Sequence, residues 1–179
     1  MNFMLDTNIY DEVLKDEQTY QKLLRLSHGD LVKLFITSVQ LNEINAIQDI
    51  KYKNRIIQIL EGLSLKKLSV ELAPYGYAYG DCYGGISPEA TLDTDKFMTS
   101  KKHVHDAMIF ATASSSKHKI DVVVTEDVKF RAKVKAQGLT TSTMNYEKFK
   151  SHISSPAHSK VIYGPKGPLY YAVMSKTES

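Results

Sequence analysis

Residues 1–8 read Met-Asn-Phe-Met-Leu-Asp-Thr-Asn, and this stretch decides the class of fold that the chain can adopt. The apolar run from Asn2 to Leu5 is too short for a helix, so it predicts a buried strand with Asp6 at its C-terminal end. Open α/β sheets keep their binding sites at the carboxyl ends of their strands. A carboxylate in that position has a desolvation cost and needs a partner. We therefore expect Asp6 to belong to a functional site.

Two further acidic residues stand where hydrophobic elements begin or end. Asp106 opens the apolar sequence Ala-Met-Ile-Phe-Ala-Thr-Ala, which predicts a helix over 104–117. Asp127 ends the sequence Val-Val-Val-Thr-Glu-Asp, which predicts a strand over 121–125. If the helix packs on the sheet, both carboxylates reach the same crevice as Asp6.

Strands and helices alternate along most of the chain. The other expected elements are a short helix after residue 8, helices at about 17–26, 39–47, 52–63 and 128–136, and strands at 34–37 and 139–144. Ser38 is expected to cap the helix that follows it. From about Leu65 to Thr99 the pattern loosens, and no element is predicted there. The alternation predicts an α/β three-layer sandwich with a mainly parallel central sheet flanked by helices.

The chain of 179 residues suits a single domain. We assign 1–150 to an α/β domain with an insertion at about 71–100 that is rich in tyrosine and glycine. We assign 151–179 to a C-terminal extension of the same domain, in which Gly164-Pro165-Lys166-Gly167 predicts the turn of a β-hairpin.

Composition narrows the setting. The formal net charge of +3 gives only weak support for a nucleic-acid partner, and a single cysteine, Cys82, excludes an intrachain disulfide. The N-terminus lacks the layout of a secretory signal, and no apolar run approaches the roughly 20 residues of a membrane-spanning helix. We expect a cytoplasmic protein with no membrane segment.

Four short motifs occur in order along the first part of the chain. They are Phe3-Met4-Leu5-Asp6-Thr7-Asn8, Glu43 on the helix after Ile36-Thr37-Ser38, His105-Asp106-Ala107-Met108-Ile109, and Val124-Thr125-Glu126-Asp127. Together they resemble the motifs of PIN-domain ribonucleases over about residues 1–149, with the toxin-like, VapC-type branch closest in style. The resemblance implies a PIN-like fold and a metal-dependent endonuclease that acts on single-stranded RNA. It also implies a homodimer and a protein antitoxin as partner.

The donor atoms agree with a metal site. Carboxylate and water oxygens suit Mg²⁺ or Mn²⁺, and a cation relieves the repulsion between carboxylates in one cleft. The expected catalytic residues are Asp6, Glu43, Asp106 and Asp127. We expect Asp6, Asp106 and Asp127 to bind the cation and Glu43 to act through water. The residues expected to hold the carboxylates in place are Thr7, Asn8 and Thr125.

Three of the four acidic residues also have a purely structural explanation, and Asp6 does not. Glu43 would serve equally well on a solvated helix face, and Asp127 as the cap of the helix that follows it. Asp106 would be a favourable charge at a helix N-terminus, an effect of about 0.3–1 kcal/mol. Glu126 would replace Asp127 in a shifted register, although Asp127 matches the motif after Thr125.

Other segments offer weaker indications of RNA binding. His103 and His105 flank Asp106, and either would contact a metal or a phosphate or remain a half-exposed surface residue. Alternating tyrosines at 74–85 would stack bases or form a loop. The candidate phosphate-binding residues beside the acids are Lys101, Lys102, Lys129 and Arg131, which continue into Lys133 and Lys135. The ordinary role of such a run is a solvated helix face.

The hypothesis is therefore a Mg²⁺- or Mn²⁺-dependent endoribonuclease, with the toxin of a toxin–antitoxin pair as its biological setting. The alternative is a non-catalytic module that keeps the PIN fold and binds RNA or a protein partner.

Overall fold

A five-stranded parallel sheet forms the centre of the computed structural model, which describes residues 1–70, 104–115, 118–137, 141–155, 162–164 and 167–169. The strands are β1 (Asn2–Leu5), β2 (Lys33–Thr37), β3 (Leu65–Leu68), β4 (Val122–Val124) and β5 (Ser142–Met144). Their order is β3-β2-β1-β4-β5, and every neighbouring pair is parallel. β1 lies in the middle, where Met4 pairs with Phe35 and Leu5 pairs with Val124. The predicted parallel sheet is confirmed.

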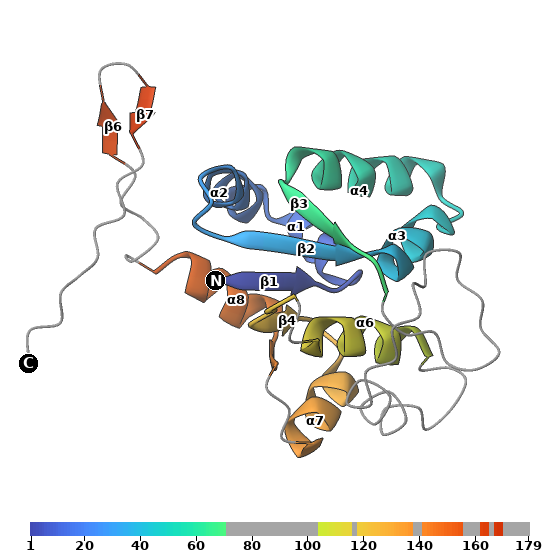
Figure 1. Cartoon of the computed structure of the whole chain (residues 1–179). Helices are drawn as coiled ribbons and strands as arrows, with labels where there is room; N and C mark the ends of the chain where they lie inside the picture. The colour runs from blue at the N-terminus through green and yellow to red at the C-terminus, as the bar shows by residue number, and fades with distance from the viewer. Residues whose placement is uncertain (71–103, 116–117, 138–140, 156–161, 165–166, 170–179) are drawn as a thin grey trace, which may run out of the picture.

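Helices cover both faces of this sheet (Figure 1). They are α1 (Ile9–Lys15), α2 (Glu17–His28), α3 (Ser38–Asn45), α4 (Ile50–Gly62), α6 (Val104–Ser114), α7 (Val128–Gln137) and α8 (Tyr146–Ile153). Buried side chains of α1, α2, α4 and α8 share one hydrophobic core, and those of α6 and α7 share the other. The three-layer sandwich expected from the sequence is therefore present. None of the helices in the described part of the chain is long and apolar enough to cross a bilayer.

The central strand contributes to both cores because side chains alternate between the two faces of a strand. Phe3 and Leu5 lie in the core shared with α1, α2, α4 and α8, whereas Met4 lies in the core formed with α6 and α7. All three side chains are fully buried. A strand buried on both faces reads as a continuous apolar run, which is why its sequence shows no alternation.

β3 was not predicted from the sequence. Its sequence is Leu-Lys-Lys-Leu, and only Leu68 is buried, so its hydrophobic pattern is too weak to predict a strand. β3 lies at the edge of the sheet, where exposed lysines are common because they discourage pairing with another chain.

α8 was also missed. Asn145 caps it by accepting a hydrogen bond from the Lys148 amide at 3.2 Å, and Phe149 and Ile153 are fully buried. The Phe149 ring meets the ring of Phe3 edge to face at 5.1 Å between centroids. α8 thus continues past residue 150 and packs beneath the central strand.

The C-terminal hairpin has the predicted antiparallel form. β6 (Ile162–Gly164) pairs with β7 (Gly167–Leu169), with Gly164 opposite Gly167. The two strands make a separate sheet and do not extend the five-stranded one. The insertion at 71–100 lies outside the described residues.

Asp16 joins α2 to α8 and should make stability depend on pH. Its carboxylate accepts the Thr19 amide hydrogen bond at 3.0 Å and pairs with Lys150 at 2.6 Å; Lys150 and the Thr19 amide lower the pKa of Asp16 to about 2. Because the folded pKa lies below the ordinary value of 3.8, this stabilisation is present above pH 4 and is lost as pH falls towards 2. Asp16→Asn should lower the melting temperature by about 1–3 °C at neutral pH, and the difference from wild type should narrow below pH 4.

Asp49→Asn is the matched control, because Asp49 caps α4 through the Tyr52 amide without an ion pair among the described residues. Asparagine caps a helix as well as aspartate does, so the control should leave stability nearly unchanged. If the difference in melting temperature between wild type and Asp16→Asn stays constant from pH 7 to pH 3, the charge of Asp16 does not contribute to stability.

Candidate metal centre

Asp6 lies where β1 ends, and polar groups from two strands surround its carboxylate. One oxygen, Oδ1, accepts a hydrogen bond from the Thr7 amide at 2.8 Å. The other, Oδ2, accepts from the Thr125 hydroxyl at 2.6 Å and from the Asn8 side-chain amide at 2.8 Å. The Asp6 amide donates to the Val124 carbonyl, which continues the ladder between β1 and β4. The carboxylate is therefore held in one orientation by residues that the sequence placed around it.

Glu43 approaches this position from α3 and is held by two contacts. Its Oε2 accepts a hydrogen bond from the Thr7 hydroxyl at 2.7 Å, and its Oε1 lies 2.8 Å from Nδ1 of His105. Glu43 is therefore a tethered side chain and not a freely solvated one. The contact with His105 assigns that histidine to Glu43, a role that sequence adjacency to Asp106 did not reveal.

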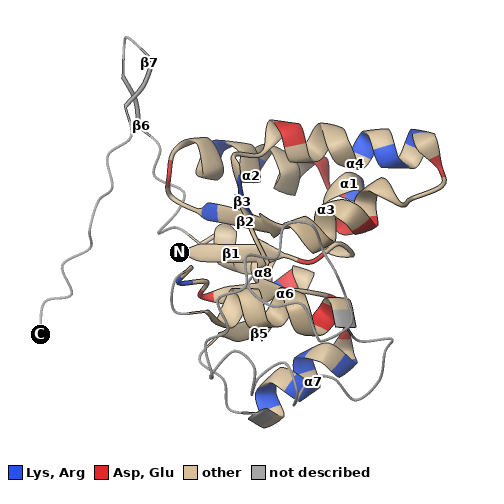
Figure 2. Cartoon of the chain, turned by 45° about the vertical axis from the view of Figure 1, so that its right-hand side comes forward, with Lys and Arg blue, Asp and Glu red and all other residues tan. Residues whose placement is uncertain are grey.

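Charge repulsion connects Asp6 with two other carboxylates. Burial raises the pKa of the Asp6 carboxyl, and the negative charges of Glu43 and Asp106 raise it further. The hydrogen bonds from Thr125 and Thr7 lower it, but the net shift is upward. Asp106 occupies the first turn of α6, as expected. Acidic residues accordingly gather where β1 ends beside α3 and α6 (Figure 2).

Asp127 lies at the start of α7 and caps that helix. Its Oδ1 accepts the Phe130 amide hydrogen bond at 2.9 Å, and its own amide donates to the Thr125 hydroxyl at 3.1 Å. Asp127 is exposed and is not among the charges that shift the Asp6 pKa. The structural role considered for Asp127 is thus real, and Thr125 is its link to Asp6.

Glu126, the alternative to Asp127, is directed towards α8. Its Oε1 accepts the Tyr146 amide hydrogen bond at 2.6 Å, and its Oε2 lies 4.0 Å from Nη1 of Arg131. The Glu126 amide donates to the side-chain oxygen of Asn8 at 3.1 Å. The contacts of the Glu126 carboxylate are therefore with α7 and α8.

Gln40 is a positioning residue that sequence reasoning missed. Its side chain is fully buried, and its Nε2 donates to the Leu5 carbonyl at 2.6 Å, just before Asp6. Its Oε1 accepts the Thr37 amide at 2.9 Å, so that Thr37, and not the predicted Ser38, caps α3. Gln40 thereby fixes the helix that carries Glu43 to the end of β1. The signal in the sequence was a Thr-x-x-Gln capping box.

The chemistry of the donors fits a hard divalent cation. The charges of Glu43 and Asp106 act on Asp6, and carboxylate oxygens are the ligands that Mg²⁺ and Mn²⁺ prefer. In their present orientations, no three His, Cys, Asp or Glu side chains of the described residues converge on one point as metal ligands do. The hydrogen bonds to Asp6 and Glu43 account for these orientations, because each oxygen of both carboxylates faces a protein partner.

The structure describes only some of the residues that the sequence predicted to bind phosphate. Lys101, Lys102 and His103 lie outside the described residues. Lys129 is exposed on α7, and Arg131 donates from Nη1 to the Thr125 carbonyl at 2.5 Å. Basic residues form bands along α7 (Figure 2).

Comparison with known proteins bears on the fold. No family model matches the chain, and no curated protein does. Among solved structures, PAE2754 from Pyrobaculum aerophilum is similar, with 12% identity, a TM-score of 0.50, and coverage of 86% of this chain and 90% of that one. VapBC2 from Rickettsia felis, bound to a DNA fragment from its promoter, has 17% identity, a TM-score of 0.49 and coverage of 81% and 98%. VapBC-1 from nontypeable Haemophilus influenzae has 17% identity, a TM-score of 0.45 and coverage of 82% and 99%.

At sequence identities of 12–17%, these similarities are evidence for the fold and not for the function. Together with the sheet order and the helices on both faces, the likeness to PAE2754 confirms the PIN-like fold that the sequence motifs implied.

Proposed function

We propose that this chain is a divalent-metal-dependent endoribonuclease that hydrolyses phosphodiester bonds of single-stranded RNA. The single observation that carries the proposal is that the carboxylates of Glu43 and Asp106 lie close enough to Asp6, at the carboxyl edge of the sheet, for their charges to act on it. The motifs of the sequence and the PIN-like fold support the same assignment.

The proposed roles follow from position. Asp6 and Asp106 would bind Mg²⁺ or Mn²⁺, and Asp127 would join them by turning from its helix cap. Glu43, held by Thr7 and His105, would orient the attacking water. The cation would activate that water and offset the charge that develops on the phosphoryl oxygens. Thr7, Asn8 and Thr125 keep the carboxylates in place.

The biological part of the proposal is a toxin of a toxin–antitoxin pair, with a protein antitoxin as partner and a homodimer as the assembled form. It is supported by the resemblance of the sequence motifs to the toxin-like branch of PIN-domain ribonucleases. Isolation of the chain with its genetic neighbour, followed by a measurement of complex formation, tests this part independently of the chemistry.

Metal addition should both stabilise the protein and switch on cleavage. A ligand that binds only the folded state increases the free energy of unfolding by mass action, by about 2.7 kcal/mol at a concentration 100 times its dissociation constant. The melting temperature rises as a result. We expect Mn²⁺ or Mg²⁺ to raise the melting temperature and to give cleavage of a labelled single-stranded RNA, and chelator to abolish both effects. Ca²⁺ serves as a comparison cation, because its larger size and flexible coordination suit a different site.

The two readouts separate the enzyme from a non-catalytic module of the same fold. Binding of RNA without metal-dependent cleavage, and without a metal-dependent shift in melting temperature, would identify the module and refute the proposed activity.

A further inference from the structure

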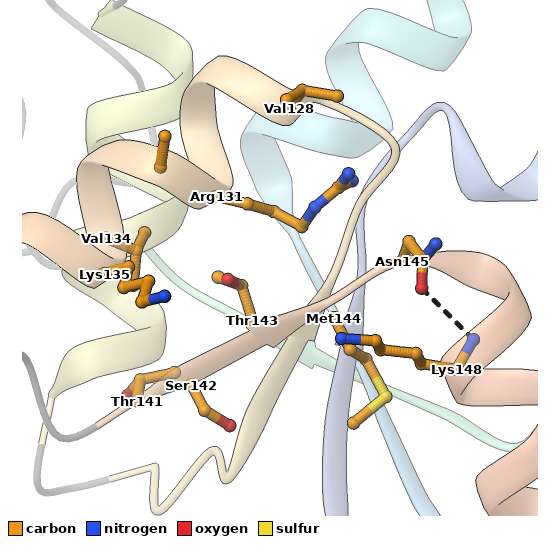
Figure 3. A pocket seen from close by; sticks show the side chains of 11 residues that line it. Val128, Arg131, Val134, Lys135, Thr141, Ser142, Thr143, Met144, Asn145 and Lys148 are labelled. Atoms are coloured by element: carbon orange, nitrogen blue, oxygen red, sulfur yellow. Dashed lines mark hydrogen bonds between the residues drawn. The ribbon is translucent and has the colours of Figure 1, made fainter.

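A groove lies beside β5, the strand at the edge of the sheet opposite β3, and its lining does not include the carboxylates of the candidate metal centre. It has a volume of about 600 Å³ and lies between α7, β5 and the start of α8. This volume is in the range of small-molecule sites, about 300–1000 Å³. Figure 3 shows Arg131 and Lys135 on the α7 side, Lys148 on the α8 side and Thr143 of β5 between them.

The lining of the groove carries positive charge only. Three of its residues are cationic and none is acidic, so the groove is complementary to an anion. Lys135 and Lys148 form no ion pair with any other residue of the described chain, and their ammonium groups are therefore available to a ligand. Thr143, Ser142 and Asn145 add neutral polar groups along the floor.

A single residue connects the groove with the proposed metal centre. The Thr125 carbonyl accepts a hydrogen bond from Arg131 at 2.5 Å, while the Thr125 hydroxyl donates to Asp6 at 2.6 Å. Arg131 thus stands at the boundary, with Lys135 and Lys148 beyond it. The cations of the groove therefore begin beside the residue that holds Asp6, where they would meet phosphates that neighbour a phosphodiester bound at the proposed metal centre.

We propose that this groove binds the phosphodiester backbone of single-stranded RNA next to the bond that is cleaved, an inference that rests on the proposed function. Lys135 and Lys148 contact phosphate oxygens, and Arg131 orders the entrance. Contacts to the backbone carry no sequence information, so the groove contributes affinity and register and not base preference.

The decisive variant is Lys135→Gln/Lys148→Gln, which removes both charges and keeps part of each aliphatic stem. Binding of a labelled single-stranded RNA to the full chain is measured in chelator at several salt concentrations. Each lost phosphate contact should reduce the slope of log affinity against log salt by about 0.7, and two contacts should weaken binding about 25-fold at about 0.1 M salt. With metal present, the same variant should raise KM and leave kcat unchanged, because binding is lost equally from the ground and transition states.

The matched control is Lys51→Gln/Arg55→Gln, which removes two exposed charges from α4. It should change neither the affinity nor the salt slope. Equal weakening by both double variants would mean that RNA responds to net charge, and that result would overturn the groove. An unchanged affinity of Lys135→Gln/Lys148→Gln would overturn it as well. Circular dichroism confirms that each variant is folded.

Polyglutamate and duplex DNA are the comparison ligands. If polyglutamate binds in a way that needs Lys135 and Lys148 while RNA does not, the occupant is an acidic protein segment and the inference is wrong. If duplex DNA binds through the two lysines as tightly as single-stranded RNA, the site does not select a single strand and the inference is also wrong.

Failure of the groove and failure of the nuclease are distinguishable. If the wild-type protein binds RNA through these lysines but never cleaves it, the groove inference holds and the proposed function is wrong. A protein that cleaves RNA equally well with and without the lysines retains the function and loses the groove.

Discussion

Asp6→Asn should reduce RNA cleavage by about 10³-fold or more, because it removes the charge that, in the proposed mechanism, holds a cation at the end of β1. Asp6 is the acidic residue on which the charges of Glu43 and Asp106 act, and the loss of several kcal/mol of charge stabilisation corresponds to this factor. Asparagine has nearly the same volume and keeps an oxygen for the Thr7 amide or the Thr125 hydroxyl. The variant should therefore remain folded but lose the metal-dependent rise in melting temperature.

Asp121→Asn is the control for Asp6→Asn. Asp121 precedes β4 at the opposite end of the sheet, where its carboxylate accepts the Asn2 amide hydrogen bond at 2.8 Å. This substitution should leave cleavage and the metal response unchanged. A folded Asp6→Asn protein that cleaves RNA at the wild-type rate would show that the carboxylates are not the catalytic site.

Thr125→Val should weaken both the fold and the proposed metal site. The Thr125 side chain is fully buried, donates to Asp6, and accepts from the Asp127 amide and the Asn8 side chain. Valine has the same shape but no hydroxyl, so donors in a partly buried position lose their acceptor. We expect a loss of about 1–3 kcal/mol in the free energy of unfolding and a 10- to 100-fold weaker metal affinity, roughly, as for other groups that orient metal ligands. Urea denaturation and metal titration of the melting temperature measure the two effects.

Thr112→Val isolates the general cost of removing a buried hydroxyl. Thr112 is equally buried, but its hydroxyl donates to the Met108 carbonyl within α6 and has no contact with the carboxylates. The control should lose some stability and keep its metal affinity. If both valine variants weaken metal binding alike, Thr125 does not position Asp6 and its effect is one of stability alone.

The parallel sheet was predictable because its three inner strands are encoded by short apolar runs. Phe3-Met4-Leu5 and Val122-Val123-Val124 are buried on both faces, and burial on both faces demands apolar residues without interruption. The position of Asp6 followed directly, since a strand of known direction has a known carboxyl end. β3 did not follow, because an edge strand needs few buried side chains, and its two lysines hide the pattern.

The sequence indicated that Asp6, Glu43 and Asp106 would lie near one another, and the charges of Glu43 and Asp106 do act on Asp6. Their contacts did not follow from the sequence, and whether these residues form a catalytic site stays a prediction. It could not show that His105 contacts Glu43, because that pair joins α3 to α6 across 62 positions of the sequence. Nor could it show which of Glu126 and Asp127 faces α8, because adjacent residues after a strand differ only in the direction of their side chains.

The sheet order determines at which point of synthesis the candidate site can assemble. β1 leaves the ribosome first, yet its neighbour β4 follows only after most of the chain has been made, and the bond from Thr125 to Asp6 spans 119 positions. Until that part of the chain has been made, the carboxylate of Asp6 lacks the Thr125 hydroxyl that fixes it. A nascent or truncated chain that ends before β4 therefore has no assembled centre. A cell that makes this protein is therefore exposed to the proposed activity only from copies that extend past Thr125.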